Sequence, residues 1–255
     1  MLLGIDVGNT NTVIGALDGL DVAHLWRVST QVRTTDELGL TLLNLLEHNG
    51  IAVSDVEGVA VCCVVPSVLY AIEKAARRYL DCDVLVVGRG IKTGMKVRTD
   101  NPREVGADRI VNSVAAYERH AGPLVVVDFG TATTFDCVSA AGDYVGGAIA
   151  PGYRISADAL FTRTAKLPRV QLERPARTIG TNTVASMQSG LFWGYVGLVD
   201  GLASRCKAEL GGEVRCVATG GLARLIGGAC ESIDETDEHL TQAGLRILWD
   251  LNRTK

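Results

Sequence analysis

Two stretches of the chain place an acidic residue, a glycine and small polar residues directly after a short apolar run. They are Asp6-Val7-Gly8-Asn9-Thr10-Asn11-Thr12-Val13 and Asp128-Phe129-Gly130-Thr131-Ala132-Thr133. Amide and hydroxyl groups donate hydrogen bonds to phosphate oxygens, glycine lets the backbone approach closely, and a carboxylate suits Mg²⁺. One copy alone is equally well explained by an Asx turn between strands. Two copies in register favour a site for nucleotide phosphates.

A third cluster, Gly106-Ala107-Asp108-Arg109-Ile110-Val111-Asn112, lies in a segment whose pattern predicts a helix over residues 102–120. Asp108 and Asn112, four residues apart, fall on one face of that helix. A glycine inside a helix costs about 1 kcal/mol relative to alanine, so Gly106 indicates a close contact at that turn. The alternative for this cluster is a solvated Asp–Arg pair on the helix surface.

Other phosphate and metal motifs are missing from the sequence or are incomplete. No Walker-type GxxxxGK[ST] occurs, and the stretch 84–94 only imitates a dinucleotide fingerprint, because its last glycine comes one residue late and no helical pattern follows. The seven cysteines include no CxxC pair, and the four histidines show no HExxH spacing. A transition-metal site is therefore disfavoured.

Each Asp-x-Gly stretch continues into a second β-prone run that turns back, the first at Asp18-Gly19 and the second at Ala141-Gly142. This duplication predicts two domains of like topology, residues 1–120 and 121–255, facing each other across a cleft. Helical periodicity lies between the strands, over residues 36–48, 67–80, 102–120, 183–210 and 235–251. The chain is therefore expected to be α/β, with mixed sheets flanked by helices.

The longest predicted helix carries glycines at positions 190, 194, 197 and 201. Steps of four, three and four place these glycines on one narrow stripe. Interior glycines destabilise an isolated helix, so the stripe indicates that another backbone packs closely against it. That backbone could belong to the same chain or to a second copy, and the spacing favours neither.

Composition limits the partners and the location of the protein. The 255 residues are 47% hydrophobic and 21% charged, with a formal net charge of −4 and no dense run of lysine or arginine. These features argue against a nucleic-acid partner. No apolar run approaches the roughly 20 residues of a membrane span, and the N-terminus shows no secretion signal. We expect a cytoplasmic protein without a membrane partner.

Taken together, these motifs resemble those of the type III pantothenate kinases, which belong to the actin/hexokinase/Hsp70-like ATPase superfamily. The resemblance spans nearly the whole chain and rests on both Asp-x-Gly stretches and on Gly106-Ala107-Asp108-Arg109. It continues through Asn101-Pro102 and the stretches 146–152, 164–168 and 181–183. It implies two similar domains of the actin-like ATPase (ribonuclease H-like) type. It also implies ATP-dependent phosphorylation of pantothenate to 4′-phosphopantothenate, the first step of coenzyme A biosynthesis.

The resemblance further implies roles for individual residues. ATP would be bound by Asp6, Val7, Gly8, Asn9, Thr10, Asn11, Thr12, Val13 and Thr131. Asp6 would hold Mg²⁺ directly or through water, and Asp128 would bind the K⁺ or NH₄⁺ that the family requires. Asp108 would be the catalytic base that accepts the proton of the attacking hydroxyl.

Pantothenate, in the same comparison, would be bound by Gly106, Ala107, Asp108, Arg109 and Thr183. The family is dimeric, so a homodimer with the substrate pocket at its interface is expected. One position departs from the family pattern, which commonly has an aromatic residue, usually tyrosine, where this chain has Thr99. Because Thr99 lacks an aromatic ring, the pocket that binds pantothenate is expected to be less tightly packed at this position.

Two other functions are open on the residues alone. A non-catalytic relative acting as a regulatory binding protein would be expected to lack Asp108 or one of the loop acids, and all of them are present. Another small-molecule kinase of the same superfamily, such as a sugar kinase, is disfavoured only through the resemblance. Composition and spacing by themselves indicate an ATP-dependent transferase with two α/β domains.

Overall fold

The computed structural model describes residues 1–253 of the chain. They form two compact units, each discontinuous in sequence. Unit 1 comprises residues 1–94 and 101–115 with the C-terminal segment from His239, and unit 2 comprises residues 95–100 and 116–238. The division into residues 1–120 and 121–255 stays a prediction.

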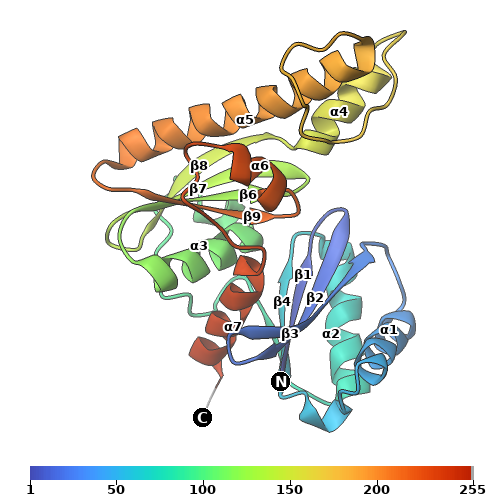
Figure 1. Cartoon of the computed structure of the whole chain (residues 1–255). Coiled ribbons are helices and arrows are strands. Elements are labelled where there is room, and N and C mark those ends of the chain that lie inside the picture. Colours follow the sequence, from blue (N-terminus) through green and yellow to red (C-terminus); the bar gives the residue numbers. More distant parts are fainter. Residues whose placement is uncertain (254–255) are drawn as a thin grey trace. The chain divides into compact units, whose positions relative to one another are not determined.

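Unit 1 is built on a five-stranded mixed sheet. Its strands are β1 (Leu2–Val7), β2 (Asn11–Asp18), β3 (Asp21–Ser29), β4 (Gly58–Cys63) and β5 (Val84–Val86), in the order β3-β2-β1-β4-β5. Strands β1 to β3 are antiparallel, whereas β4 and β5 run parallel to β1. Helices α1 (Thr35–His48) and α2 (Pro66–Leu80) cover one face, and α7 (Leu240–Asn252) packs on the other (Figure 1).

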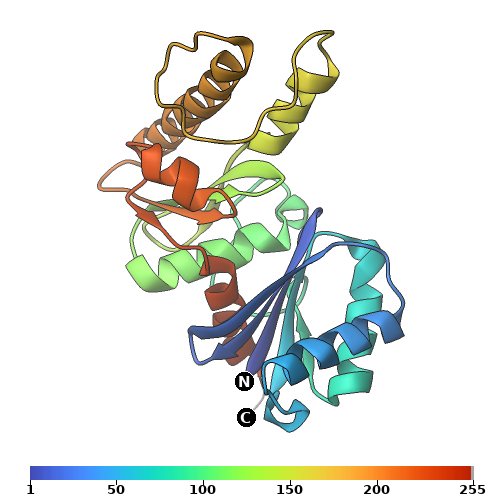
Figure 2. The same cartoon turned by 45° about the vertical axis from the view of Figure 1, so that its right-hand side comes forward.

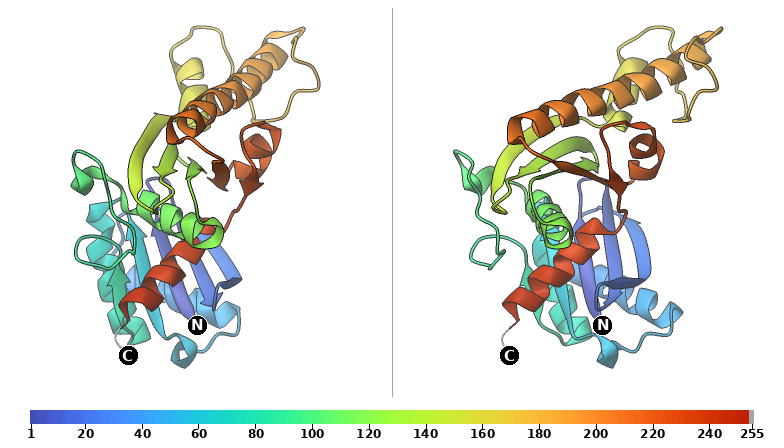
Figure 3. Two further views of the ribbon diagram at one scale, coloured as in Figure 1. Left: turned by 90° about the vertical axis from the view of Figure 1, so that its left-hand side faces the viewer. Right: turned by 60° about the vertical axis from the view of Figure 1, so that its left-hand side comes forward.

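Unit 2 contains a second five-stranded sheet. Its strands are β6 (Leu124–Phe129), β7 (Ala132–Val138), β8 (Tyr144–Pro151), β9 (Arg215–Gly220) and β10 (Glu235–Thr236), in the order β10-β9-β6-β7-β8. The long helix α5 (Thr183–Leu210) lies along one face of this sheet (Figure 3). Helix α4 (Tyr153–Thr162) is joined to α5 by a long loop without helix or strand (Figure 2). Helix α6 (Ala223–Ile226) completes the core of this unit.

The two sheets have the same topology when both are followed from their antiparallel edge. In each, a central strand (β1 or β6) pairs antiparallel with the next strand and parallel with a strand that follows a helical crossover. The turns at Asp18-Gly19 and Ala141-Gly142 form as predicted, joining β2 to β3 and β7 to β8. The prediction of two similar α/β domains with mixed sheets and flanking helices is therefore confirmed. Each Asp-x-Gly stretch lies where the central strand ends.

The helix predicted from Pro102 is wrong in its first turn. Residues Pro102–Glu104 form a short 3₁₀ helix (η2), Val105 is extended, and α3 (Ala107–His120) begins only afterwards. The Asn101 side chain accepts a hydrogen bond from the Arg103 N–H at 3.3 Å and so caps the 3₁₀ turn instead of a longer helix. Gly106 therefore precedes the helix, and its presence needs a reason other than close packing within a helical turn.

The predicted C-terminal helix also begins later than expected. Residues Glu235–Thr236 form β10, which pairs parallel with β9, and the Glu235 carboxylate lies 3.4 Å from the Arg119 guanidinium. The sheet and this ion pair hold the segment extended, so α7 starts at Leu240. Two further short 3₁₀ turns, η1 (Val53–Asp55) and η3 (Gly227–Ala229), and the helix α4 were not predicted. Among the described residues, no helix has the length and apolar character needed to cross a membrane.

Candidate active site

The first Asp-x-Gly loop of unit 1 is a tight turn between β1 and β2. The Gly8 N–H donates to the Asn11 carbonyl at 3.0 Å, which closes the turn. Thr30, just after β3, donates its hydroxyl to the Gly8 carbonyl at 2.7 Å and lies 2.9 Å from the Thr12 hydroxyl. The contacts of Thr30 therefore hold the loop in place on the side of β3.

The predicted ATP-binding residues of this loop differ in what they present to solvent. Asn9 and Thr10, at the tip, are exposed, and Asp6 is half-buried next to the end of β4. Val7 and Thr12 are buried, so only their backbone groups can take part in binding. The half-buried residues Gly8, Asn11 and Val13 complete the predicted set. The loop thus offers an exposed polar tip beside a carboxylate, an arrangement that suits phosphate and Mg²⁺.

The second loop, in unit 2, joins β6 to β7 and contains Gly130 and the exposed Thr131. Gly152, at the start of α4, packs against this turn. A Cβ at position 152 would lie 2.8 Å from the Gly130 carbonyl oxygen and closer still to that of Thr131. Only glycine therefore lets the backbone before α4 support the loop so closely.

The half-buried Asp128 carboxylate lies beside a glycine that sequence reasoning missed. Gly220 ends β9 with φ +89°, and a Cβ there would collide with the Asp128 carboxylate and approach the Phe129 backbone to 2.8 Å. The signal in the sequence is Thr219-Gly220-Gly221 after an apolar run. Gly220 therefore leaves room for the carboxylate, whose hard oxygen atoms suit a cation.

Asp108, in the first turn of α3 in unit 1, is held in a partly dehydrated position. Burial raises the pKa of its carboxyl group, although the Arg109 backbone and guanidinium partly oppose this shift. The Arg109 N–H donates to Asp108 Oδ1 at 2.8 Å, and a Cβ at Gly106 would lie 2.5 Å from the same oxygen. The Gly106 position therefore stays free of a side chain to make room for the carboxylate. A carboxylate with a raised pKa is a better proton acceptor than an exposed one.

Some neighbours of Asp108 on α3 are partly exposed to solvent, whereas another is buried and contacts α7. Ala107 and Arg109 are half-buried, whereas Asn112 is 1% exposed and accepts a hydrogen bond from Thr241 of α7 at 2.7 Å. Asn112 therefore ties α3 to α7 within unit 1. Asp108 and Arg109 are both half-buried, which disfavours the solvated surface pair that the sequence left open.

Thr99 belongs to the short segment of unit 2 that runs beside the first residue of β8. The segment is fixed by a bridge between Val97 and Tyr144 and by an Arg98–Asp143 ion pair of 2.9 Å. The Thr99 hydroxyl is buried and has no hydrogen-bond partner among residues 1–253. Its methyl group lies 4.0 Å from a Cβ built on Gly146.

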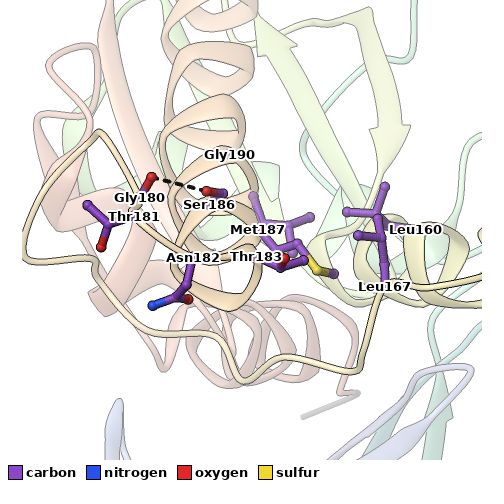
Figure 4. Close-up of a pocket in the computed structure, with 10 residues that line it drawn as sticks. Leu160, Leu167, Gly180, Thr181, Asn182, Thr183, Ser186, Met187 and Gly190 are labelled. Atoms are coloured by element: carbon purple, nitrogen blue, oxygen red, sulfur yellow. Dashed lines mark hydrogen bonds between the residues drawn. The ribbon is translucent and has the colours of Figure 1, made fainter.

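Thr183 is exposed at the first turn of α5, on the wall of an open hollow of about 710 Å³ (Figure 4). The turn is ordered, because Asn182 Oδ1 accepts from the Ala185 N–H at 2.9 Å and Ser186 donates to the Gly180 carbonyl at 3.3 Å. The hollow is lined by Leu160, Leu167, Gly180, Thr181, Asn182, Thr183, Ser186, Met187, Gly190 and Leu191. It combines apolar walls with hydroxyl and amide groups, as small-molecule sites do.

The glycine stripe of α5 begins at the same hollow, with Gly190. At Gly190, Gly194 and Gly197, a built Cβ would meet no atom within 4 Å beyond its own helical turn among the described residues. At Gly201 the nearest atom is the tip of Arg205, at 3.4 Å. The alternative in which the stripe packs against the chain's own backbone is therefore wrong, and the stripe lies open on the surface of unit 2.

Comparison with known proteins shows the family of the chain. The family model "Type III pantothenate kinase" matches residues 2–205. A type III pantothenate kinase of Anaeromyxobacter sp. (strain Fw109-5) is 55% identical over 99% of this chain and 100% of its own length. Among solved structures, a Campylobacter jejuni protein described as a Baf family transcriptional activator superposes with a TM-score of 0.57 at 18% identity, covering 97% of each chain.

A Porphyromonas gingivalis protein described as an N-acetylglucosamine kinase gives a TM-score of 0.51 at 11% identity, covering 98% of each chain. These distant structures support the two-domain fold alone, whereas the identity to the sequence relatives is high and covers the whole chain. The chain belongs to the type III pantothenate kinase family.

Proposed function

We propose that the protein transfers the γ-phosphoryl group of ATP to the hydroxyl of pantothenate, forming 4′-phosphopantothenate in the first step of coenzyme A biosynthesis in the cytoplasm. The observation that carries this proposal is the family match over residues 2–205, which includes every candidate site residue. The structure supports it with two equivalent loops after Asp6 and Asp128 and with a half-buried carboxylate of raised pKa at Asp108.

The reaction is an in-line displacement at phosphorus. The pantothenate hydroxyl oxygen forms a bond to the γ-phosphorus, the bond from that phosphorus to the bridging oxygen breaks, and ADP leaves with the electron pair. Asp108 accepts the proton of the hydroxyl, and its raised pKa favours that role. Residues 6–13 and Thr131 bind the phosphates of ATP and hold them in line with the hydroxyl.

Two cations fit the residues that are present. The half-buried Asp6 at the end of β1 would hold Mg²⁺, directly or through water, and Asp128 between Gly130 and Gly220 would hold K⁺ or NH₄⁺. When bound, these cations offset negative charge on the phosphates. Asp6 and Asp128 would fix the positions of these cations, and Arg109 adds a third positively charged group for the substrate.

We assign pantothenate binding to Gly106, Ala107, Asp108, Arg109, Thr99 and Thr183. The proposed assembly is a homodimer in which a second copy packs on the glycine stripe and completes the substrate pocket. The open surface of Gly190, Gly194 and Gly197 supports this assembly, because exposed interior glycines destabilise a helix unless another backbone covers them.

A coupled assay of ADP release tests the proposal. ATP turnover should require pantothenate and Mg²⁺ and should depend on K⁺ or NH₄⁺. N-acetylglucosamine serves as the control acceptor, since a protein described as an N-acetylglucosamine kinase shares the fold. Turnover with a sugar and none with pantothenate would refute the assignment while leaving the kinase fold intact.

A further inference from the structure

The second phosphate loop is connected to α5 by a buried tyrosine, Tyr195. Tyr195 is 5% exposed and points from α5 toward the sheet of unit 2. Its hydroxyl is hydrogen-bonded to the hydroxyl of Thr133, which is itself fully buried. Thr133 lies two residues after Thr131 and pairs with Phe129 across the turn, so this bond anchors the base of the loop.

Tyr195 also contacts the two backbone segments on either side of that loop. Its ring lies 6.2 Å from the Phe129 ring, just before Gly130, and 5.7 Å edge-on from the Tyr153 ring, just after Gly152. Because Gly152 packs against the carbonyls of the loop, one side chain contacts both the strand that enters the loop and the segment that supports it.

We propose that Tyr195 is a positioning residue for the ATP-phosphate loop: its hydroxyl, bonded to Thr133, holds the turn at Gly130–Thr131 in the conformation that binds nucleotide. The inference rests on the proposed function, in which Thr131 contacts the phosphates of ATP. Loss of the hydroxyl leaves the buried Thr133 hydroxyl without this partner. Without this bond the loop samples more conformations in the free protein. Ordering it on nucleotide binding then costs more conformational entropy, so the affinity for nucleotide falls.

The chain offers a matched control for this substitution. Tyr195→Phe and Tyr153→Phe each remove one buried phenol hydroxyl from the same aromatic cluster. The Tyr153 hydroxyl, unlike that of Tyr195, has no hydrogen-bond partner in the described part of the chain. A general effect of removing a polar atom from this core would therefore appear in both variants, whereas a positioning effect appears only in Tyr195→Phe.

The experiment measures MgADP binding by calorimetry and the KM values for ATP and pantothenate in the full chain. In Tyr195→Phe, the Kd for MgADP and the KM for ATP should rise about tenfold, which corresponds to one hydrogen bond of about 1.4 kcal/mol. The KM for pantothenate should stay unchanged, and Tyr153→Phe should match the wild type. An unchanged nucleotide affinity in Tyr195→Phe, or equal losses in both variants, would overturn the inference.

Substitutions at the other end of the bond give an independent test if Tyr195→Phe does not fold. Thr133→Val removes the hydroxyl at nearly constant shape and should weaken MgADP binding as Tyr195→Phe does, whereas Thr133→Ser should retain affinity. Where Tyr195→Phe folds, the two losses should not add in the double variant Tyr195→Phe/Thr133→Val, because both substitutions remove the same bond. Additive losses would show that the hydroxyls act separately and would overturn the inference.

The same measurements separate this inference from the proposed function. A wild-type chain that binds MgADP but does not phosphorylate pantothenate refutes the substrate assignment, and the calorimetric comparison still decides the role of Tyr195. A wild-type chain that binds no MgADP would overturn both.

Discussion

Replacing Asp108 by asparagine tests the chemistry most directly. Asparagine has nearly the same shape, and its side-chain oxygen can still accept the Arg109 N–H that now reaches Asp108 Oδ1 at 2.8 Å. The substitution therefore removes the charge and the ability to accept a proton but preserves the local hydrogen bond. General base catalysis contributes about 10²–10⁴-fold. We expect kcat to fall at least about a hundredfold, equivalent to roughly 3 kcal/mol or more of transition-state stabilisation.

The same substitution should have the opposite effect on stability. Burial raises the pKa of Asp108 in the folded chain, so its contribution to stability is full below the unfolded pKa and is lost as the pH rises through the folded pKa. Asparagine does not titrate. We therefore expect Asp108→Asn to have a larger unfolding free energy than the wild type. This difference should grow as the pH rises from about 4 to 7.

The two effects are measured by steady-state kinetics and by urea unfolding at several pH values. Asp18→Asn is the control, because it makes the same chemical change at an exposed turn of unit 1. Near-normal turnover in Asp108→Asn would remove Asp108 from the mechanism. If Asp108→Asn is less stable than the wild type at pH 7, the half-buried charge of Asp108 is stabilised more strongly than its contacts indicate.

Four further outcomes are expected. Activity should collapse in Na⁺ or Tris buffer and return with K⁺ or NH₄⁺, and Asp128→Ala should not respond to this exchange; equal wild-type rates in every salt would refute the cation site. Thr99→Tyr should lower the KM for pantothenate, and an unchanged or raised KM would mean that another residue fills the wall. Gly194→Leu should give monomers by light scattering and lose activity together, whereas a folded, active dimer would exclude the glycine stripe as the subunit surface. Gln242→Met should raise the unfolding free energy in urea by about 1–3 kcal/mol, because neither amide atom of this 2% exposed side chain has a partner in residues 1–253; a less stable variant would reveal one.

Local signals in the sequence were sufficient where an element is fixed by its own residues. Helix α5 begins and ends where predicted because Asn182 caps its first turn and Gly211, with φ +69°, follows its last residue. The two hairpins form at Asp18-Gly19 and Ala141-Gly142 because Gly19 and Gly142 adopt φ +59° and +78°. Each Asp-x-Gly stretch then lies at the end of a central strand, which is why the duplicated pattern predicted the topology of both sheets.

Features that depend on distant residues were not predictable from local patterns. The helical periodicity continues through residues 102–106, yet the chain departs from the α-helix there, where η2 forms and the Asp108 carboxylate occupies the space beside Gly106. Tyr195 and Gln242 read only as members of apolar helix faces, because Thr133 and the glycines of β1 and β2 that they contact lie far away in the sequence. Their partners are known only once the sheets have formed.

Helix α5 connects two of the proposed features, and this connection makes the loss of activity in Gly194→Leu informative. Gly194 lies on the exposed stripe, whereas the adjacent Tyr195 is bonded to Thr133 below the second phosphate loop. If separation of the subunits only opened the pocket at Thr183, the KM for pantothenate would rise and MgADP would bind as in the wild type. If the leucine also shifts α5 against its sheet, the Tyr195 bond transmits the shift and MgADP affinity falls as in Tyr195→Phe. Calorimetry on Gly194→Leu therefore decides whether subunit contact and nucleotide binding are coupled through this helix.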